Sequence, residues 1–189
     1  MESTPLAKRT KFSAADLVLP AVFTALTAVC AWISIPLGPV PFTLQTLAVL
    51  LCGGLLGVRR SMYAMLVYTA LGAIGVPVFS GFSSGLASPS SGFVVGFIFT
   101  ALVTALITQR FGHSFPVLLI AMLLGDISCY LFGIPWFMTL YFQTKGPISL
   151  GSTLAACVIP FIIPDLCKIV LAAFLTNRLI KPMQRLFRK

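Results

Sequence analysis

The sequence predicts an all-α membrane protein, a compact bundle of six transmembrane helices with both termini in the cytoplasm. Of its 189 residues, 58% are hydrophobic and only 9% are charged, whereas a soluble domain carries about 25% charged residues. This composition excludes a soluble enzyme, because so few charges cannot cover a water-exposed surface. Since a spanning helix needs about 20 apolar residues, the chain holds roughly six spans in one membrane domain, residues 1–189.

Six apolar segments are the expected spans. The first follows the basic residues Lys8, Arg9 and Lys11 and is longer than the apolar core of a cleaved signal peptide, which favours a retained helix. The second is short enough to be tilted or partly submerged. Residues 153–159 fit either an interfacial helical turn or an early start of the last span. The expected spans are residues 17–35, 43–58, 61–79, 92–108, 115–133 and 162–180.

The distribution of Lys and Arg predicts the orientation. Eleven of the thirteen lie in the N-terminal segment 1–12, in the segments that follow the second and fourth expected spans, and towards the C-terminus, including the tail 181–189. The opposite connections hold only Lys145. The excess of basic residues marks the cytoplasmic side of the cell membrane. Both termini are therefore expected on that side, and the connections that follow the first, third and fifth spans are expected outside. The net charge of +9 is thus explained by membrane topology, and we expect no nucleic-acid partner; the tail is expected to lie on anionic lipid.

Two of the outward connections, residues 36–42 (the first connection) and residues 80–92 (the second connection), carry no charge. Proline stiffens the first, while Gly and Ser in the second allow close approach to a ligand and offer hydrogen bonds. These segments fit ordinary extracellular connections, and they also fit a lid over the bundle.

Asp165 and Lys168 are the main candidates for chemistry. They stand three residues apart, so they share one face of the last helix and can pair. A charge inside the membrane costs about 2.5 to 3.5 kcal/mol and normally faces the interior, where it marks a substrate or ion path. The pair either only fixes helix packing or binds a ligand, and we favour a ligand.

Other residues suggest less. Asp126, near Ser128 and Tyr130, could hydrogen-bond across helices, line the site or be protonated; we favour a structural or supporting role. The five cysteines lack metal-site spacing, and the single His113 lacks acidic or thiol neighbours, so we predict no metal site and no cofactor. No GxxxxGK[ST] motif occurs, so ATP-driven work would need a partner protein.

Small residues spaced by four form a stripe on the first helix: Ala21 with Ala25, and Thr24 with Ala28. Such stripes let helices approach closely in lipid. The stripe fits internal packing, and it also fits an exposed docking face for another membrane subunit.

Four motifs in order resemble the BioY family, the biotin-specific substrate-capture (S) components of energy-coupling-factor (ECF) transporters. The resemblance covers residues 12–178. The motifs are IPLGPVPFTLQTL at 35–47, LGAIGVPVF at 71–79, LFGIPW at 131–136 and PFIIPDLCK at 160–168.

The resemblance implies a biotin pocket near the outer face, closed by the two uncharged outward connections, residues 36–42 and 80–92. It assigns biotin binding to Asp165 and Lys168, and docking onto a transmembrane coupling protein, served by two ABC-type ATPases, to the small residues of the first helix, Ala21 and Ala25. Where the family reads Gly-Pro-Thr-Gly-Gly-Tyr, this chain reads SPSSGF, so Phe93 lacks a hydroxyl that Ser90 or Ser91 would replace. Further expected ligand contacts are Thr43, Gln45, Phe79, Gly85, Ser90, Ser91 and Phe93.

The predicted function is therefore capture of biotin at the outer face and its delivery inward, with ATP hydrolysed by partner subunits. Asp165 is expected to accept ureido N–H groups, and Lys168 to hold that carboxylate or bond a ligand oxygen. The alternatives are an S component for another vitamin, a membrane-embedded enzyme using Asp126, Asp165 and Lys168, and a passive facilitator or channel, which the lack of repeated pore-lining polar groups disfavours.

Overall fold

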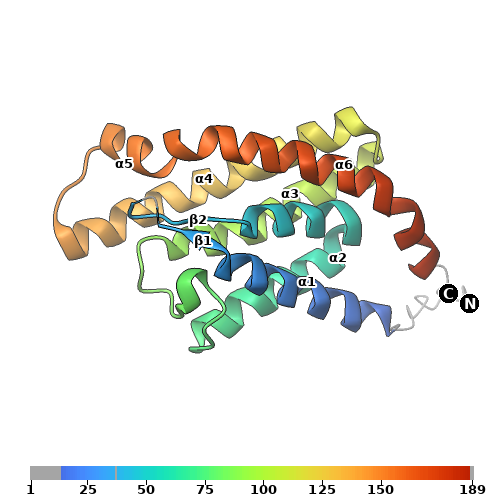
Figure 1. The fold of residues 1–189 in the computed structure, drawn as a ribbon, viewed down its shortest axis with the longest axis horizontal. Coiled ribbons are helices and arrows are strands. Elements are labelled where there is room, and N and C mark those ends of the chain that lie inside the picture. Colours follow the sequence, from blue (N-terminus) through green and yellow to red (C-terminus); the bar gives the residue numbers. More distant parts are fainter. Residues whose placement is uncertain (1–13, 37, 188–189) are drawn as a thin grey trace, which may run out of the picture.

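The computed structural model describes residues 14–36 and 38–187, whose long helices lie side by side in an elongated bundle (Figure 1). The expected basic segment 1–12, as well as Arg188 and Lys189, lie outside the described residues. The helices are α1 (Ala15–Trp32), α2 (Gln45–Ala73), α3 (Ser91–Phe111), α4 (Phe115–Lys145), α5 (Leu150–Cys157) and α6 (Ile162–Phe187).

Five helical stretches of the described chain are long and apolar enough to cross a membrane. They are α1, α2, α3, α4 and the stretch Leu150–Arg185, which contains α5 and most of α6. The expectation of an all-α membrane protein is confirmed.

Helix α2 is two antiparallel segments that meet at Gly57. In a straight helix Gln45 and Tyr68 would lie about 35 Å apart, yet the Gln45 amide donates a hydrogen bond to the Tyr68 hydroxyl. Gly57 has φ 73° and ψ 172°, a region open almost only to glycine, and a Cβ there would lie 2.5 Å from the Gln109 amide nitrogen. The chain therefore turns back at Gly57, near the end of the second expected span, residues 43–58 (Figure 1).

The end of the third expected span and the end of the fifth were wrong. Residues 61–79 were expected to be helical, but α2 ends at Ala73, followed by Gly75 at φ 105°. The fifth span was expected to end at residue 133, but α4 continues through Pro135 to Lys145. Proline removes only one helical hydrogen bond, and the apolar residues after it keep the helix favourable in lipid.

The ambiguous stretch before the last span forms a separate short helix. Helix α5 is followed by the 3₁₀ turn η2 (Ile159–Phe161), after which α6 begins. Pro160 lies in this turn and Pro164 lies in the first turn of α6, where a missing N–H costs little. Residues 153–159 are therefore mostly part of α5, and the last span begins at Ile162, as expected.

Two connections cover one end of the bundle. Strands β1 (Ser34–Ile35) and β2 (Phe42–Thr43) pair antiparallel, so the first connection leads from the end of α1 back to the start of α2. The second connection contains the 3₁₀ turn η1 (Ser80–Phe82). The Phe82 ring stacks on Trp32 at 5.0 Å between centroids, and the Trp32 indole donates to the Pro77 carbonyl at 3.0 Å. These contacts fasten the second connection to the end of α1.

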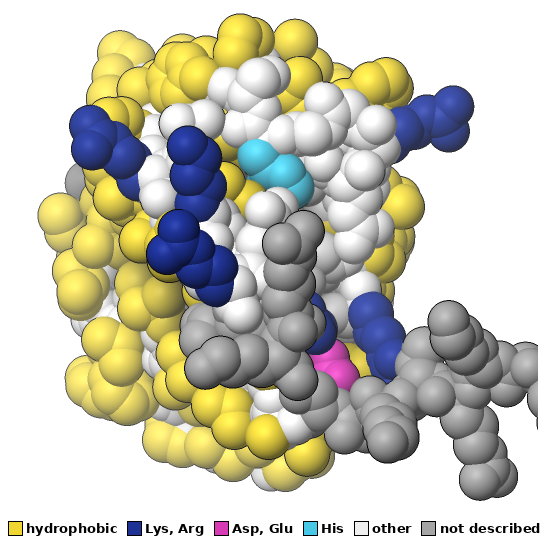
Figure 2. All heavy atoms as spheres, turned by 90° about the vertical axis from the view of Figure 1, so that its right-hand side faces the viewer, with side chains coloured by type: hydrophobic (Ala, Val, Ile, Leu, Met, Phe, Trp, Pro, Cys, Tyr) yellow, Lys and Arg dark blue, Asp and Glu magenta, His cyan; other side chains and the backbone are white. Residues whose placement is uncertain are grey.

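Basic side chains gather at the opposite end of the bundle. Helix α1 begins there, α6 ends there, and α2 turns back there (Figure 1). Figure 2 shows several Lys and Arg side chains on this face, together with the single histidine of the chain, His113. Burial lowers the pKa of His113.

Candidate functional site

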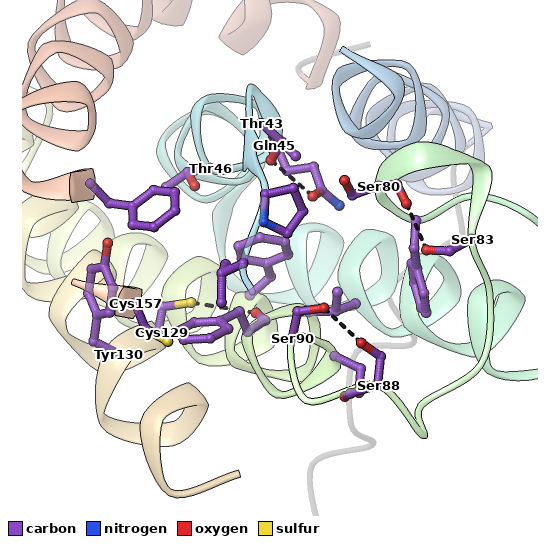
Figure 3. Close-up of a pocket in the computed structure, with 18 of the residues that line it drawn as sticks. Thr43, Gln45, Thr46, Ser80, Ser83, Ser88, Ser90, Cys129, Tyr130 and Cys157 are labelled. Carbon is purple, nitrogen blue, oxygen red and sulfur yellow. Dashed lines mark hydrogen bonds between the residues drawn. The ribbon is translucent and has the colours of Figure 1, made fainter. Parts of the chain in front are cut away.

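A cavity of about 180 Å³ lies beneath the two connections. Figure 3 shows the labelled residues reaching it from β2 and the start of α2, from the serine-rich connection between α2 and α3, from α4 and from the end of α5. Its wall combines serine hydroxyls, two carboxyl groups and one amino group with aromatic rings. The lining residues are Val40, Pro41, Thr43, Gln45, Thr46, Phe79, Ser80, Ser83, Ser84, Gly85, Ser88, Ser90, Ser91, Phe93, Val94, Phe97, Asp126, Cys129, Tyr130, Cys157, Phe161, Asp165 and Lys168.

The Asp165–Lys168 pair forms as expected and lies on the cavity wall. The Lys168 ammonium donates to Asp165 Oδ1 at 2.9 Å, and the two residues are 6% and 5% exposed. Their i, i+3 spacing on α6 brings them together without any tertiary contact. An ammonium has three donors and a carboxylate about four acceptor positions. Both groups therefore keep hydrogen-bonding capacity that faces the cavity.

Two further side chains hold this pair, and the sequence analysis missed both roles. The Tyr130 hydroxyl on α4 donates to Asp165 Oδ2 at 2.6 Å. The centroid of the Phe42 ring lies 4.3 Å from the Lys168 nitrogen, which makes a cation–π contact. Tyr130 and Asp165 are 35 residues apart, so only the packing of α4 against α6 joins them. The motif IPLGPVPFTLQTL contained Phe42, but no spacing rule linked it to Lys168.

A chain of hydrogen bonds fixes the start of α2 on the cavity wall. The Thr43 hydroxyl donates to Gln45 Oε1 at 3.0 Å, and the Gln45 amide donates to the Tyr68 hydroxyl. Tyr68 in turn donates to the Val78 carbonyl at 2.9 Å. Thr43 and Gln45 are thus both on the wall, but the Gln45 amide is already engaged within the protein.

Aromatic rings seated against glycines shape the apolar part of the wall. A Cβ on Gly72 would lie 2.0 Å from the ring of Phe79, and one on Gly133 would lie 2.4 Å from the ring of Phe93. The Phe93 ring meets Tyr130 edge-on at 6.0 Å. Both rings can occupy these positions only because the facing helix residue has no side chain.

The serine-rich connection is ordered by its own hydrogen bonds. The Ser91 hydroxyl donates to the Leu86 carbonyl at 2.7 Å, and Ser88 and Ser90 hydroxyls lie 3.0 Å apart. Gly85, at φ 83°, donates its N–H to the Gly72 carbonyl at 2.8 Å. The Ser91 hydroxyl proton is therefore committed to the backbone, which leaves Ser90 as the freer candidate to replace the hydroxyl that Phe93 lacks.

Asp126 lies on the cavity wall, 7% exposed. Ser128 and Tyr130 do not bond it, because the Ser128 hydroxyl donates to the Gly125 carbonyl and Tyr130 donates to Asp165. Of the roles weighed for Asp126, the cross-helix hydrogen bond is absent among the described residues, and the wall position favours lining the site over the supporting role.

All nine residues expected to contact a ligand line this one cavity. They come from α6, β2, the start of α2, the second connection and the start of α3. The docking candidates Ala21 and Ala25 lie elsewhere, exposed on α1, whereas Thr24 and Ala28 are buried. The Thr24 hydroxyl donates to the Ala64 carbonyl at 2.9 Å. The small-residue stripe thus divides into an inner pair that packs on α2 and an outer pair that is open.

No group of three or more His, Cys, Asp or Glu side chains in the described part of the chain could hold a metal ion. Five cysteines are free, and Cys129 and Cys157 lie on the cavity wall. The cavity therefore offers hydrogen bonds and apolar contacts from this chain's own side chains.

Residues 6–185 match the family profile described as the BioY family. The chain belongs to the BioY family. A relative in Thermotoga maritima named biotin transporter BioY is 39% identical over 169 residues, which cover 88% of this chain and 96% of that protein. A biotin transporter BioY of Rhizobium etli is 40% identical over 177 residues, 86% of this chain and 91% of that protein.

A solved structure has the same fold. It is the crystal structure of the S-component for biotin from an ECF-type ABC transporter, with a TM-score of 0.77, 28% sequence identity, and coverage of 93% of this chain and 95% of that one. The family resemblance of the four BioY motifs is confirmed.

Proposed function

We propose that this BioY protein captures biotin in the cavity beneath its two connections and delivers it inward as the S component of an ECF-type vitamin uptake system. The observation that carries the proposal is the buried Asp165–Lys168 pair on the cavity wall. Two charges in an apolar bundle are costly, and they are placed where a polar guest can use their remaining hydrogen bonds. The names of the relatives support biotin as that guest.

The ureido ring of biotin suits this wall. Its N–H groups match the carboxylate oxygens, its carbonyl oxygen matches the free donors of Lys168, and its apolar ring and chain match Phe79, Phe93 and their neighbours. A buried site built to pair with N–H groups rejects an analogue without them by about 10⁴-fold, because its own acceptors would be stranded. Thr43, Gln45, Gly85, Ser90 and Ser91 are proposed to complete the contacts around the ligand.

The chain is proposed to cross the membrane six times. The reversal at Gly57 divides α2 into two rods, which with α1, α3, α4 and α6 makes six. The first rod, residues 45–56, is about 18 Å long and so reaches only part of the way across a core of about 30 Å. The basic end of the bundle (Figure 2) is proposed to face the cytoplasm of the cell membrane, which places the cavity at the outer face.

Transport is proposed to need partner subunits. Ala21 and Ala25 are exposed on α1, at a spacing that lets another helix approach closely. A transmembrane coupling protein would dock there, with two ABC-type ATPases supplying the energy. The chain itself acts as a binding and transport subunit, and catalysis is assigned to the ATPases.

A ligand screen on purified protein tests the proposal. A ligand that binds the folded protein stabilises it by an amount that grows with the logarithm of its concentration over its Kd. Biotin at micromolar concentration should therefore raise the unfolding temperature, whereas thiamine, riboflavin and folate should leave it unchanged. A rise with one of those vitamins instead of biotin would make the chain an S component for another substrate. Chemical conversion of an added lipid or vitamin by the isolated chain would indicate the membrane-enzyme alternative.

A further inference from the structure

Asp126 is a carboxyl group on the cavity wall that accepts no hydrogen bond from the described residues of the protein. It is 7% exposed and lies on the cavity wall with Cys129 and Tyr130, which follow it by three and four residues on α4. That spacing puts the three side chains on one helical face. They differ in their partners: the Cys129 thiol donates to the Phe93 carbonyl and Tyr130 donates to Asp165. Within residues 14–36 and 38–187, no donor bonds the Asp126 carboxyl.

Asp165, on α6 and on the wall of the same cavity, already accepts hydrogen bonds from the protein at both oxygens. One of its oxygens accepts a hydrogen bond from the Lys168 ammonium at 2.9 Å, and the other accepts one from the Tyr130 hydroxyl at 2.6 Å. The protein alone therefore satisfies both oxygens of Asp165 and neither oxygen of Asp126. A buried carboxyl without a donor is costly, and a donor arriving with the ligand removes that cost only when the site is occupied.

We propose that Asp126 is a ligand contact that accepts a hydrogen bond from one ureido N–H of biotin. The ureido ring carries two such groups, and the cavity holds two carboxyls, of which Asp126 has the greater free acceptor capacity. Asp126 then contributes to specificity, because a ligand with a second N–H donor binds with higher affinity than a ligand without it. This inference rests on the proposed function and adds a residue to its binding site.

Calorimetric titrations with biotin and two analogues test the contact. In each analogue a different one of the two ureido N–H groups is replaced by N–CH₃. The protein carries either Asp126 or the Asp126→Leu substitution, which keeps a similar volume without acceptors. The control is Ser128→Ala, one residue from Cys129 on α4, whose hydroxyl bonds only the Gly125 carbonyl and does not line the cavity.

The expected result has two parts. Asp126→Leu lowers the affinity for biotin by roughly 10- to 100-fold, as for the loss of one hydrogen bond to a charged group, and Ser128→Ala leaves it unchanged. The substitution also removes the penalty for one methylated analogue while leaving the penalty for the other. A merely structural role would weaken all three ligands equally, and that outcome overturns the inference.

Three further cases are decisive. If Asp126→Leu does not fold, Asp126→Asn replaces it, with an expected loss of roughly tenfold because a neutral acceptor makes a weaker bond; affinity equal to the unsubstituted protein overturns the inference. If the unsubstituted protein binds biotin and Asp126→Leu binds it equally well, only the inference fails. If the unsubstituted protein is folded and binds no biotin, the proposed function fails, and the inference with it.

Discussion

Two ion pairs lie at opposite ends of the bundle, and they differ in what surrounds them. Lys168 and Asp165 are 2.9 Å apart with side chains 7% and 8% exposed, and both belong to α6. Arg60 and Asp16 are 2.7 Å apart with side chains 20% and 12% exposed, and they join α2 to α1. The more buried pair links neighbours on one helix, while the more open pair connects two helices.

This contrast argues against a mainly structural role for the cavity pair. A buried ion pair often stabilises a protein no better than apolar side chains of the same volume would. A pair within one helix also adds no direct link between helices, although Tyr130 connects Asp165 to α4. The Arg60–Asp16 pair joins two helices, as a structural ion pair is expected to do. The Asp165–Lys168 pair instead lines the cavity in which the ligand is proposed to bind.

The largest effect should come from breaking the cavity pair. Lys168→Ala leaves the Asp165 carboxylate buried without its cation and removes the donors that face the cavity, so biotin affinity should fall by roughly 10³-fold or more. Arg60→Ala, the matched change in the other pair, should leave the affinity unchanged. The measurement is an equilibrium titration of purified protein, with thermal unfolding to verify that each variant is folded. A loss below tenfold for Lys168→Ala would contradict the assignment, and Asp165→Asn should behave as Lys168→Ala does.

A second prediction separates binding from coupled transport. Ala25→Trp places a bulky ring on the exposed side of α1, where close helix approach is expected. Biotin uptake by cells that contain the full ECF system should fall by roughly tenfold or more, while biotin binding to the purified chain stays unchanged. Ile127→Trp, at a position 43% exposed on α4, is the control. Normal uptake with Ala25→Trp would exclude this face of α1 as the docking site.

A smaller effect is expected where the second connection is fastened to α1. Phe82→Ala removes the stacking on Trp32, and an aromatic pair of this kind contributes about 0.5 to 1.5 kcal/mol. Biotin should then dissociate roughly 2- to 10-fold faster, because the cover of the cavity opens more easily. Chase of labelled biotin from the purified protein measures the rate. An unchanged rate would show that this contact does not hold the cavity closed.

The smallest effect is expected at the basic end. Asp16→Asn weakens the contact with Arg60, and partly exposed pairs contribute about 0 to 1 kcal/mol. The unfolding temperature should therefore fall by only a few degrees, and biotin affinity should not change. If this substitution altered the affinity, the two ends of the bundle would be coupled and the contrast between the pairs would fail.

Local spacing predicted much of the site, and long-range packing supplied the rest. The Asp165–Lys168 contact followed from an i, i+3 spacing, which any helix enforces. The Tyr130–Asp165 bond and the Phe42–Lys168 contact depend on how α4 and the first connection pack against α6. No rule that reads a single segment can find such contacts, although a tyrosine one turn after Asp126 was a usable signal.

The same distinction explains the fold. Apolar runs located the membrane helices, because lipid requires them. They did not show that α4 continues past Pro135 to about 46 Å in length, because proline in a lipid-facing helix is tolerated and reads in the sequence as a stop. Gly57 was not singled out, although only glycine allows the reversal there.

Isothermal titration of the purified chain with biotin, without any partner subunit, tests the central claim most directly. The account predicts saturable binding at one site per chain, because the cavity and its charged wall come from this chain alone. Absence of saturable binding by protein that is demonstrably folded in a lipid nanodisc would contradict it.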